Sequence, residues 1–134
     1  MGKLTEFLTK NKVDNTVTRE VEIKPFPHPF VIKSITQAES EQIRKSCITT
    51  EFNKRTHQKE QRADRDLYIT KMVAACTVDP CFKDSDLQAA YGVMGAEDLI
   101  GKLLTPGQYT ALVEAIEEIN NFDSMSELVE EAKN

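Results

Sequence analysis

The segment from Thr105 to Ile119 constrains the fold of this chain more than any other. Its apolar residues, among them Leu112 and Ile116, recur at helical spacing opposite a row of Gln and Glu side chains. Thr105 suits the N-cap of a helix, and Pro106 suits the first helical position, where its missing N–H costs nothing. The spacing predicts an amphipathic helix, whose apolar face has to pack on a core.

Other helix starts are indicated by the residues that cap them. Residues 36–39, Thr-Gln-Ala-Glu, fit a capping box in which hydroxyl and carboxylate satisfy free N–H groups. Asp64 or Asp66 can begin a helix that is apolar on most faces, which is typical of a buried helix. Gly92 suits a left-handed helix end. Shorter helices are predicted at three further starts: Asp84, Gly95 and Ser124.

The first 35 residues combine a helical patch with two strands. Leu4, Phe7 and Leu8 are spaced like one face of a helix, which is so short that it must dock or fray. Residues 16–24 alternate apolar and polar side chains, and residues 30–35 resume a strand. Three prolines within residues 25–29 cannot continue a central strand, so we expect a hairpin that leans on the helices that follow.

Together these elements predict a mainly α (α+β) fold, in which a small N-terminal β-hairpin packs on a bundle of about five to six short helices. The 134 residues fit a single domain, 1–134. It comprises an N-terminal arm and hairpin, 1–35, and a helical part, 36–134. Residues 51–63 are charged and show no apolar periodicity, so we interpret them as an exposed, mobile connection; a solvated helix extension is the alternative.

Charge is distributed unevenly along the chain. Residues 1–67 carry 13 Lys/Arg and 10 Asp/Glu, a balance of +3, whereas residues 68–134 carry 4 and 12, a balance of -8. The acidic half argues against nucleic-acid binding there. No segment approaches the roughly 20 apolar residues of a membrane helix, and nothing near Met1 resembles a signal peptide. We therefore expect an intracellular protein without membrane contact.

The sequence carries few of the motifs that are typical of catalytic or metal-binding sites. It has no phosphate-binding glycine motif. Its three cysteines and two histidines lack the spacing of a zinc site, so Cys47, Cys76 and Cys81 are interpreted as reduced thiols. The histidines, His28 and His57, lie in unrelated segments, which disfavours nucleophilic catalysis. We expect no enzyme activity, no cofactor and no metal.

Two features remain as candidate binding surfaces. One is the set of basic residues around the charged connection, for which a solvated segment is favoured over nucleic-acid contact because no aromatic residues are interleaved: Lys54, Arg55, Lys59, Arg62 and Arg65. The other is the apolar surface of the short helices near the C-terminus. Most of that surface is expected to be core.

The order of segments resembles the XkdN-like tail assembly chaperones of long-tailed bacteriophages and defective prophages. The likeness runs from about Val17 to Phe122, and two stretches carry it best: Leu-Gln-x-x-Tyr-Gly-Val at residues 87–93 and Leu-x-Pro-Gly-x-Tyr-x-x-Leu at residues 104–112. The resemblance implies a non-enzymatic protein of the host bacterial cytoplasm. Such proteins hold the tape measure protein before the tail tube polymerises around it.

The resemblance also directs the choice of binding residues. A helical protein can cover the apolar stripes of a long helical partner by helix-in-groove packing. The predicted partner surface, or its immediate support, consists of five residues: Leu99, Leu103, Tyr109, Leu112 and Ile116. The phage tape measure protein is the expected partner, with the tail tube protein and a homo-oligomer as further candidates. A small nucleic-acid-binding regulator and a structural tail or adaptor subunit are the alternative functions.

Overall fold

A three-stranded antiparallel sheet forms one layer of the protein. The computed structural model describes residues 2–120 and shows β1 (Thr18–Val21), β2 (Phe30–Lys33) and β5 (Thr77–Asp79) in the order β1-β2-β5. The central strand β2 buries Phe30 and Ile32, which alternate with half-buried neighbours. This alternation is that of a strand with one face on the core.

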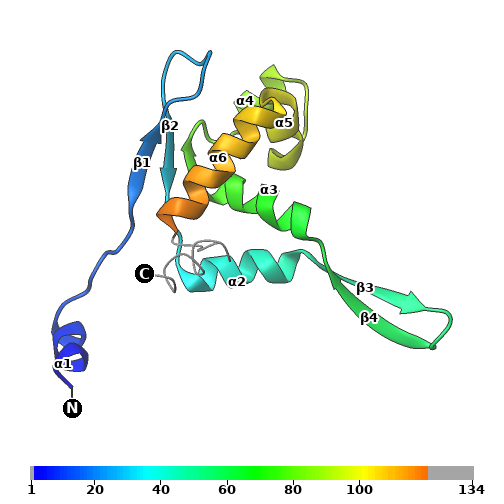
Figure 1. The fold of residues 1–134 in the computed structure, drawn as a ribbon, viewed down its shortest axis with the longest axis horizontal. Helices are drawn as coiled ribbons and strands as arrows, with labels where there is room; N and C mark the ends of the chain where they lie inside the picture. Colours follow the sequence, from blue (N-terminus) through cyan, green and yellow to red (C-terminus); the bar gives the residue numbers. More distant parts are fainter. Residues whose placement is uncertain (1, 121–134) are drawn as a thin grey trace, which may run out of the picture.

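Within the described residues, five helices complete the core together with this sheet (Figure 1). They are α2 (Gln37–Ser46), α3 (Arg65–Cys76), α4 (Ser85–Ala90), α5 (Ala96–Leu103) and α6 (Pro106–Ile119). Helix α6 packs on β1 and β2, and α3 packs on α2, α5 and α6. The core between them contains fully buried side chains from the sheet, the helices and one loop: Ile32, Val73, Phe82, Leu99 and Leu112.

Local capping fixes where the helices begin, and four predicted starts are confirmed. The hydroxyl or carboxylate of the N-cap residue accepts a hydrogen bond from the backbone N–H three residues later at Thr36, Asp64, Asp84 and Thr105. At this last helix start a second bond completes the capping box, because Gln108 Oε1 accepts the Thr105 N–H at 2.9 Å. Gly92 is in the left-handed region, with φ of 67°, as predicted for the end of α4.

Side-chain amides join segments that are far apart in the chain. Asn120 Oδ1 accepts from the Ile35 N–H at 2.8 Å, which ties the end of α6 to the segment after β2. Gln108 Nε2 donates to the Lys24 carbonyl at 2.8 Å. Both amides satisfy backbone groups that have no partner within a helix or strand, so they fix the loops around the core.

The predicted fold class is wrong in its architecture. The hairpin of β1 and β2 does not pack on a helical bundle, because β5 pairs with β2 and makes a three-stranded sheet around which the helices lie. Strand β5 follows α3 without an intervening loop, and no strand was predicted there. The protein is instead an α+β fold with two small antiparallel sheets. A three-residue strand is too short to show an alternating pattern in the sequence.

The second sheet is a hairpin of β3 (Ile48–Asn53) and β4 (Gln58–Ala63). It occupies the segment for which the sequence suggested a connection or a helix extension. The segment is exposed, as expected, but the Asp64 N–H bonds the Cys47 carbonyl at 2.9 Å and closes the hairpin at its base. His57 in the turn has a φ of 56°, a conformation that non-glycine residues adopt rarely.

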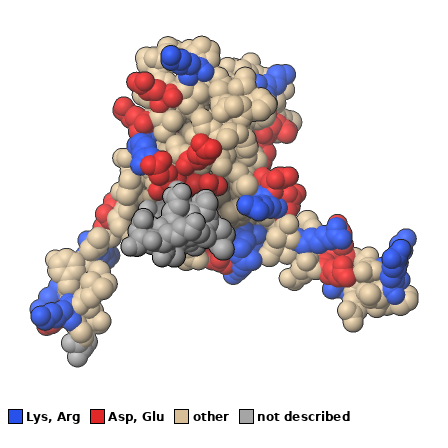
Figure 2. All heavy atoms as spheres, in the orientation of Figure 1, with Lys and Arg blue, Asp and Glu red and all other residues tan. Residues whose placement is uncertain are grey.

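Two arms extend from the body (Figure 1). The hairpin β3–β4 is one arm. The other is α1 (Lys3–Lys10), which lies apart from the body at the end of an extended segment and buries none of its residues. Lys and Arg side chains lie toward the ends of both arms, whereas Asp and Glu gather on the body (Figure 2). The helix predicted to begin at Ser124 lies outside the described residues.

Candidate partner-binding groove

An open groove of about 500 Å³ lies between α3, α5 and α6. It is lined by residues from all three helices and from the turn that joins α5 to α6: Asp66, Ile69, Thr70, Glu97, Ile100, Gly101, Leu104, Thr105, Pro106 and Tyr109. This volume is in the range of ligand-binding clefts. Because the groove is open along helix faces, its shape suits a side-chain row of another helix.

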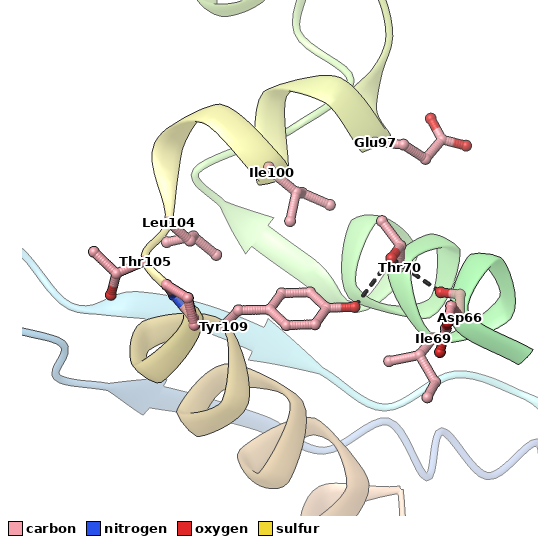
Figure 3. A pocket seen from close by; sticks show the side chains of 10 residues that line it. Asp66, Ile69, Thr70, Glu97, Ile100, Leu104, Thr105 and Tyr109 are labelled. Atoms are coloured by element: carbon pink, nitrogen blue, oxygen red, sulfur yellow. Dashed lines mark hydrogen bonds between the residues drawn. The ribbon is translucent and has the colours of Figure 1, made fainter.

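The inner surface of the groove is apolar and anchored in the core. Ile100 and Leu104 are 2% and 8% exposed, so only their edges reach the groove. The Tyr109 ring extends across it from α6, and its hydroxyl lies 3.0 Å from the Thr70 hydroxyl (Figure 3). Since Thr70 donates its hydrogen to the Asp66 carbonyl at 3.0 Å, Tyr109 must be the donor to Thr70. The ring is thereby held in one orientation.

One end of the groove is acidic. Asp66 and Glu97 lie in the first turns of α3 and α5, where negative charge is favourable. Figure 3 places both residues at the end of the groove away from Thr105. No Lys or Arg is among the ten lining residues. The groove therefore combines an apolar surface with a negative end and suits an apolar segment that carries positive charge.

Gly101 leaves the groove open on the α5 side. It is exposed, lies inside the helix, and a Cβ built there would meet no heavy atom within 4 Å. Glycine is unfavourable in a helix interior compared with alanine. Its presence on the groove wall keeps space free that a side chain would fill.

The structure divides the five predicted partner-surface residues between the core and three hollows. Leu99 and Leu112 are fully buried and can act only as support. Ile116 is 3% exposed and lines a small apolar hollow of about 40 Å³ between α3 and α6. Tyr109 lines the groove. Leu103 lines a separate hollow of about 280 Å³ beside the proline-rich turn.

Sequence reasoning missed most of the groove. Ile69, Ile100 and Leu104 line the groove but are not among the five predicted partner-surface residues. The sequence suggested only helix starts for the acidic pair, and Gly101 was not singled out at all. No local signal could have joined them, because the groove exists only once α3 lies beside α5 and α6.

The basic residues of the charged connection lie on the β3–β4 arm, except Arg65, which begins α3. Arg62 pairs with Glu51 at 3.6 Å, and Glu60 accepts a hydrogen bond from Asn53 at 2.8 Å. Phe52, 59% exposed, is the large apolar side chain of this arm. The acids of the same hairpin therefore reduce the positive field that a nucleic-acid partner would need.

No group of three or more His, Cys, Asp or Glu side chains within residues 2–120 could hold a metal ion. Cys47 and Cys76 are buried and Cys81 is exposed. Burial raises the pKa of the Cys76 thiol to about 11, although Asn120 donates a hydrogen bond to its sulfur at 3.7 Å. A thiol held protonated in this way is a poor nucleophile. In the same residues, no helix has the length and apolar character needed to cross a bilayer.

A family model described as "Phage XkdN-like tail assembly chaperone protein, TAC" matches residues 4–133. The chain belongs to the phage XkdN-like tail assembly chaperone family. This confirms the resemblance found in the sequence. Membership in the family implies a tail assembly chaperone role, a non-enzymatic one, and binding to phage tail proteins.

The fold of this tail assembly chaperone is also found in a solved structure. The crystal structure titled as that of the protein yqbn superposes with a TM-score of 0.69 and 22% sequence identity, over 92% of this chain and 99% of that one. At this identity the likeness shows the fold alone. A comparison with curated proteins finds no significant match.

Proposed function

We propose that this chaperone binds the phage tape measure protein in the host bacterial cytoplasm and keeps it soluble until the tail tube polymerises. The observation that carries the proposal is the open apolar groove between α3, α5 and α6 in a chain of this family. A tape measure protein is a very long helical chain with apolar stripes. A helix that lays such a stripe into a groove is a common mode of peptide recognition.

The contact residues follow from the groove. Tyr109 offers a ring whose orientation is fixed by Thr70, and Ile69 and Ile100 offer aliphatic surface beside it. Leu99, Leu112 and Ile116 support this surface from the core, and Leu103 lies at the neighbouring hollow. One groove binds only a short stretch of client, so we expect modest affinity for each site and many copies along one partner.

The body contributes through its charge. Residues 64–120 carry four Lys/Arg and ten Asp/Glu, a balance of -6. Copies arrayed along one client would present this negative surface outward and repel other coated chains. The groove thus covers apolar client surface, while the body opposes association between complexes.

Co-expression with the tape measure protein tests the proposal. Gly101→Arg should fill the groove with a long side chain without disturbing the fold, because the position is open and the new residue can pair with Glu97 one turn earlier. Gly101→Ala is the matched control, since it adds only a methyl group. We expect the tagged parent chain and the Ala variant to co-purify with soluble tape measure protein.

The Arg variant should recover at least about tenfold less client. Equal recovery by both variants would place the client elsewhere on the protein, and no recovery by the parent chain would overturn the proposal. The structural-subunit alternative predicts a different result: the chain would be present in purified particles in fixed proportion to tail proteins, as measured by mass spectrometry.

A further inference from the structure

Helix α1 presents an apolar stripe that the rest of the described chain does not cover. Leu4, Phe7 and Leu8 are 68%, 50% and 49% exposed, although they lie within about 100° of each other around the helix. An isolated helix of 8 residues is marginal in water, because helix nucleation is costly and packing supplies most of the stability of a helix in a protein. Helix α1 therefore needs a surface on which to pack.

The charges of α1 define the kind of surface that it fits. Lys3 and Lys10 lie seven residues apart, about 10 Å along the axis, and both flank one edge of the apolar stripe. Glu6 faces away from the stripe, on the outer side of the two lysines, three residues after Lys3 and four before Lys10. The stripe thus has one positive edge, and the matching surface is an apolar groove with a negative side.

We propose that α1 of one copy docks into the groove between α3, α5 and α6 of a second copy. Leu4, Phe7 and Leu8 would pack on the apolar wall formed by Ile69, Ile100 and Tyr109. Lys3 and Lys10 would face the acidic end, where Asp66 and Glu97 lie. This contact pairs the stripe of one arm with the apolar surface of one groove, and it matches their charges.

The position of the arm favours a second copy over the arm's own groove. Val17 is fixed to the end of β2, because its N–H bonds Ser34 Oγ and its carbonyl accepts the Ser34 N–H, both at 2.8 Å. The same end of the sheet meets the C-terminal part of α6, where Arg19 pairs with Glu118 at 3.2 Å. Tyr109 lies at the other end of α6, so the arm points away from its own groove (Figure 1).

The contact is head-to-tail, since an arm of one copy meets the body of the next. Such contacts close into rings or continue as open chains. The inference uses the groove that the proposed function assigns to the client, so a bound client would displace α1. Self-association does not depend on the tape measure protein, and the two proposals can fail separately.

Sedimentation velocity over a concentration series tests self-association of the full chain. Phe7→Asp places a charge in the stripe and should weaken association by roughly tenfold or more. Thr9→Asp adds the same charge about 160° around the helix from Phe7 and is the matched control. We expect the parent chain and the Thr9 variant to associate equally, and the Phe7 variant to stay monomeric over the same range. A monomeric parent chain, or association of the Phe7 variant at the parent's level, would overturn the inference.

A charge exchange tests the pairing itself. The double variants Lys3→Glu/Lys10→Glu and Asp66→Lys/Glu97→Lys should each lose self-association, and an equimolar mixture of the two should recover it. Failure of the mixture to associate would contradict the proposed orientation. If the second double variant does not fold, Gly101→Arg takes its place as the groove-blocked chain and should accept no α1 from the parent.

A mixed-label experiment separates the two copies. A spin label on Thr9→Cys, outside the apolar stripe, is placed in chains without ¹⁵N in a Cys81→Ser background, and these chains are mixed with ¹⁵N-labelled parent chains. Paramagnetic broadening of the Gly101 amide in the labelled chains is the expected result. If the Gly101 amide broadens only when the spin label and ¹⁵N are in the same chain, the arm covers its own groove. That result would overturn the inference.

The Phe7→Asp chain also distinguishes this inference from the proposed function. With its groove free of α1, it should recover the tape measure protein at least as well as the parent chain. A monomeric Phe7 variant that recovers no client would refute the proposed function alone. A parent chain that recovers client but never self-associates would refute the inference alone.

Discussion

At the scale of single residues, Thr77 stands out because its buried hydroxyl makes no hydrogen bond within the described residues. It begins β5 opposite Ile32 and is 4% exposed. A buried hydroxyl without a partner costs about 1–3 kcal/mol. Thr77→Val keeps the branched shape and suits a strand, so it should raise the free energy of unfolding by about 1 kcal/mol.

Thermal or urea unfolding of Thr77→Val measures this gain. Thr77→Ser is the control, because it keeps the hydroxyl and loses only the methyl group, and it should destabilise the protein. A Val variant less stable than the parent would mean that the hydroxyl has a bonding partner in solution.

The buried thiol of Cys76 should make the free energy of unfolding depend on pH above about pH 9. Burial raises the pKa of its thiol in the folded protein from 9.0 to about 11, so folding favours the protonated thiol. Below pH 9 the thiol is protonated in both states, and its contribution is complete. Above pH 9 the unfolded thiol ionises first, so the free energy of unfolding should fall until about pH 11, by up to about 2–3 kcal/mol.

Urea unfolding between pH 8 and pH 11 tests this dependence. Other groups also titrate in that range, so the quantity to compare is the slope against pH for the parent and for Cys76→Ala. The Ala variant should be less stable near pH 8, because it leaves a cavity, but its stability should decline less steeply towards pH 11. Parallel slopes would show that the thiol ionises equally in both states.

At the scale of elements, the helix starts could be predicted because capping is local. The four caps that the structure confirms each depend on one side chain and a backbone N–H three residues away, and both are visible in the sequence. The pairing of β1 with β2 was also predictable, since β2 has one buried face and the proline-rich turn separates the two strands.

The hairpin β3–β4 could not be predicted in the same way. Most of its residues are exposed on both faces, so no alternation of apolar and polar residues marks the strands. Its turn also lacks the glycine that usually marks a tight hairpin, and His57 adopts the positive φ instead. A charged segment without apolar periodicity is typical of a loop. Here the segment forms two strands, which are joined by hydrogen bonds between their backbones.

Because this hairpin buries almost nothing, its removal should leave the body intact. Residues 49–62 can be replaced by Asn-Gly, which connects Ile48 to Ala63 at positions that already face each other. We expect the midpoint of thermal unfolding to stay within about 2 °C of the parent value, since exposed residues contribute little to stability. A large drop would show that the hairpin packs on the body in solution.

At the scale of the whole molecule, the groove and the arms illustrate a limit of sequence reasoning. Periodicity identified Leu99, Leu112 and Tyr109 as apolar positions, but it could not distinguish the two that fill the core from the one that lines the groove. That distinction depends on which helices lie side by side, which is set by packing between distant segments. The exposure of Leu4, Phe7 and Leu8 likewise follows from where β1 is fixed.

The whole chain also carries a segregation of charge. The segments 3–12 and 48–63 each have a balance of +2, whereas residues 64–120 have a balance of -6. Opposite charges on the arms and the body favour contact between copies. The attraction between them weakens as added salt shortens the screening length, which is about 10 Å at 0.1 M. Association through the arms should therefore respond to salt, while the core should not.

A single core predicts a single unfolding transition. One cluster of buried side chains contains residues from the sheet, α3, α5 and α6, and neither arm contributes to it. Far-UV circular dichroism and tyrosine fluorescence should therefore give coincident thermal curves, as expected for one domain. The Phe7→Asp chain should give the same curve as the parent when both are measured at a concentration where the parent is monomeric. Two separated transitions would divide the chain into two domains, and a shift caused by Phe7→Asp in the monomer would mean that α1 packs on its own body.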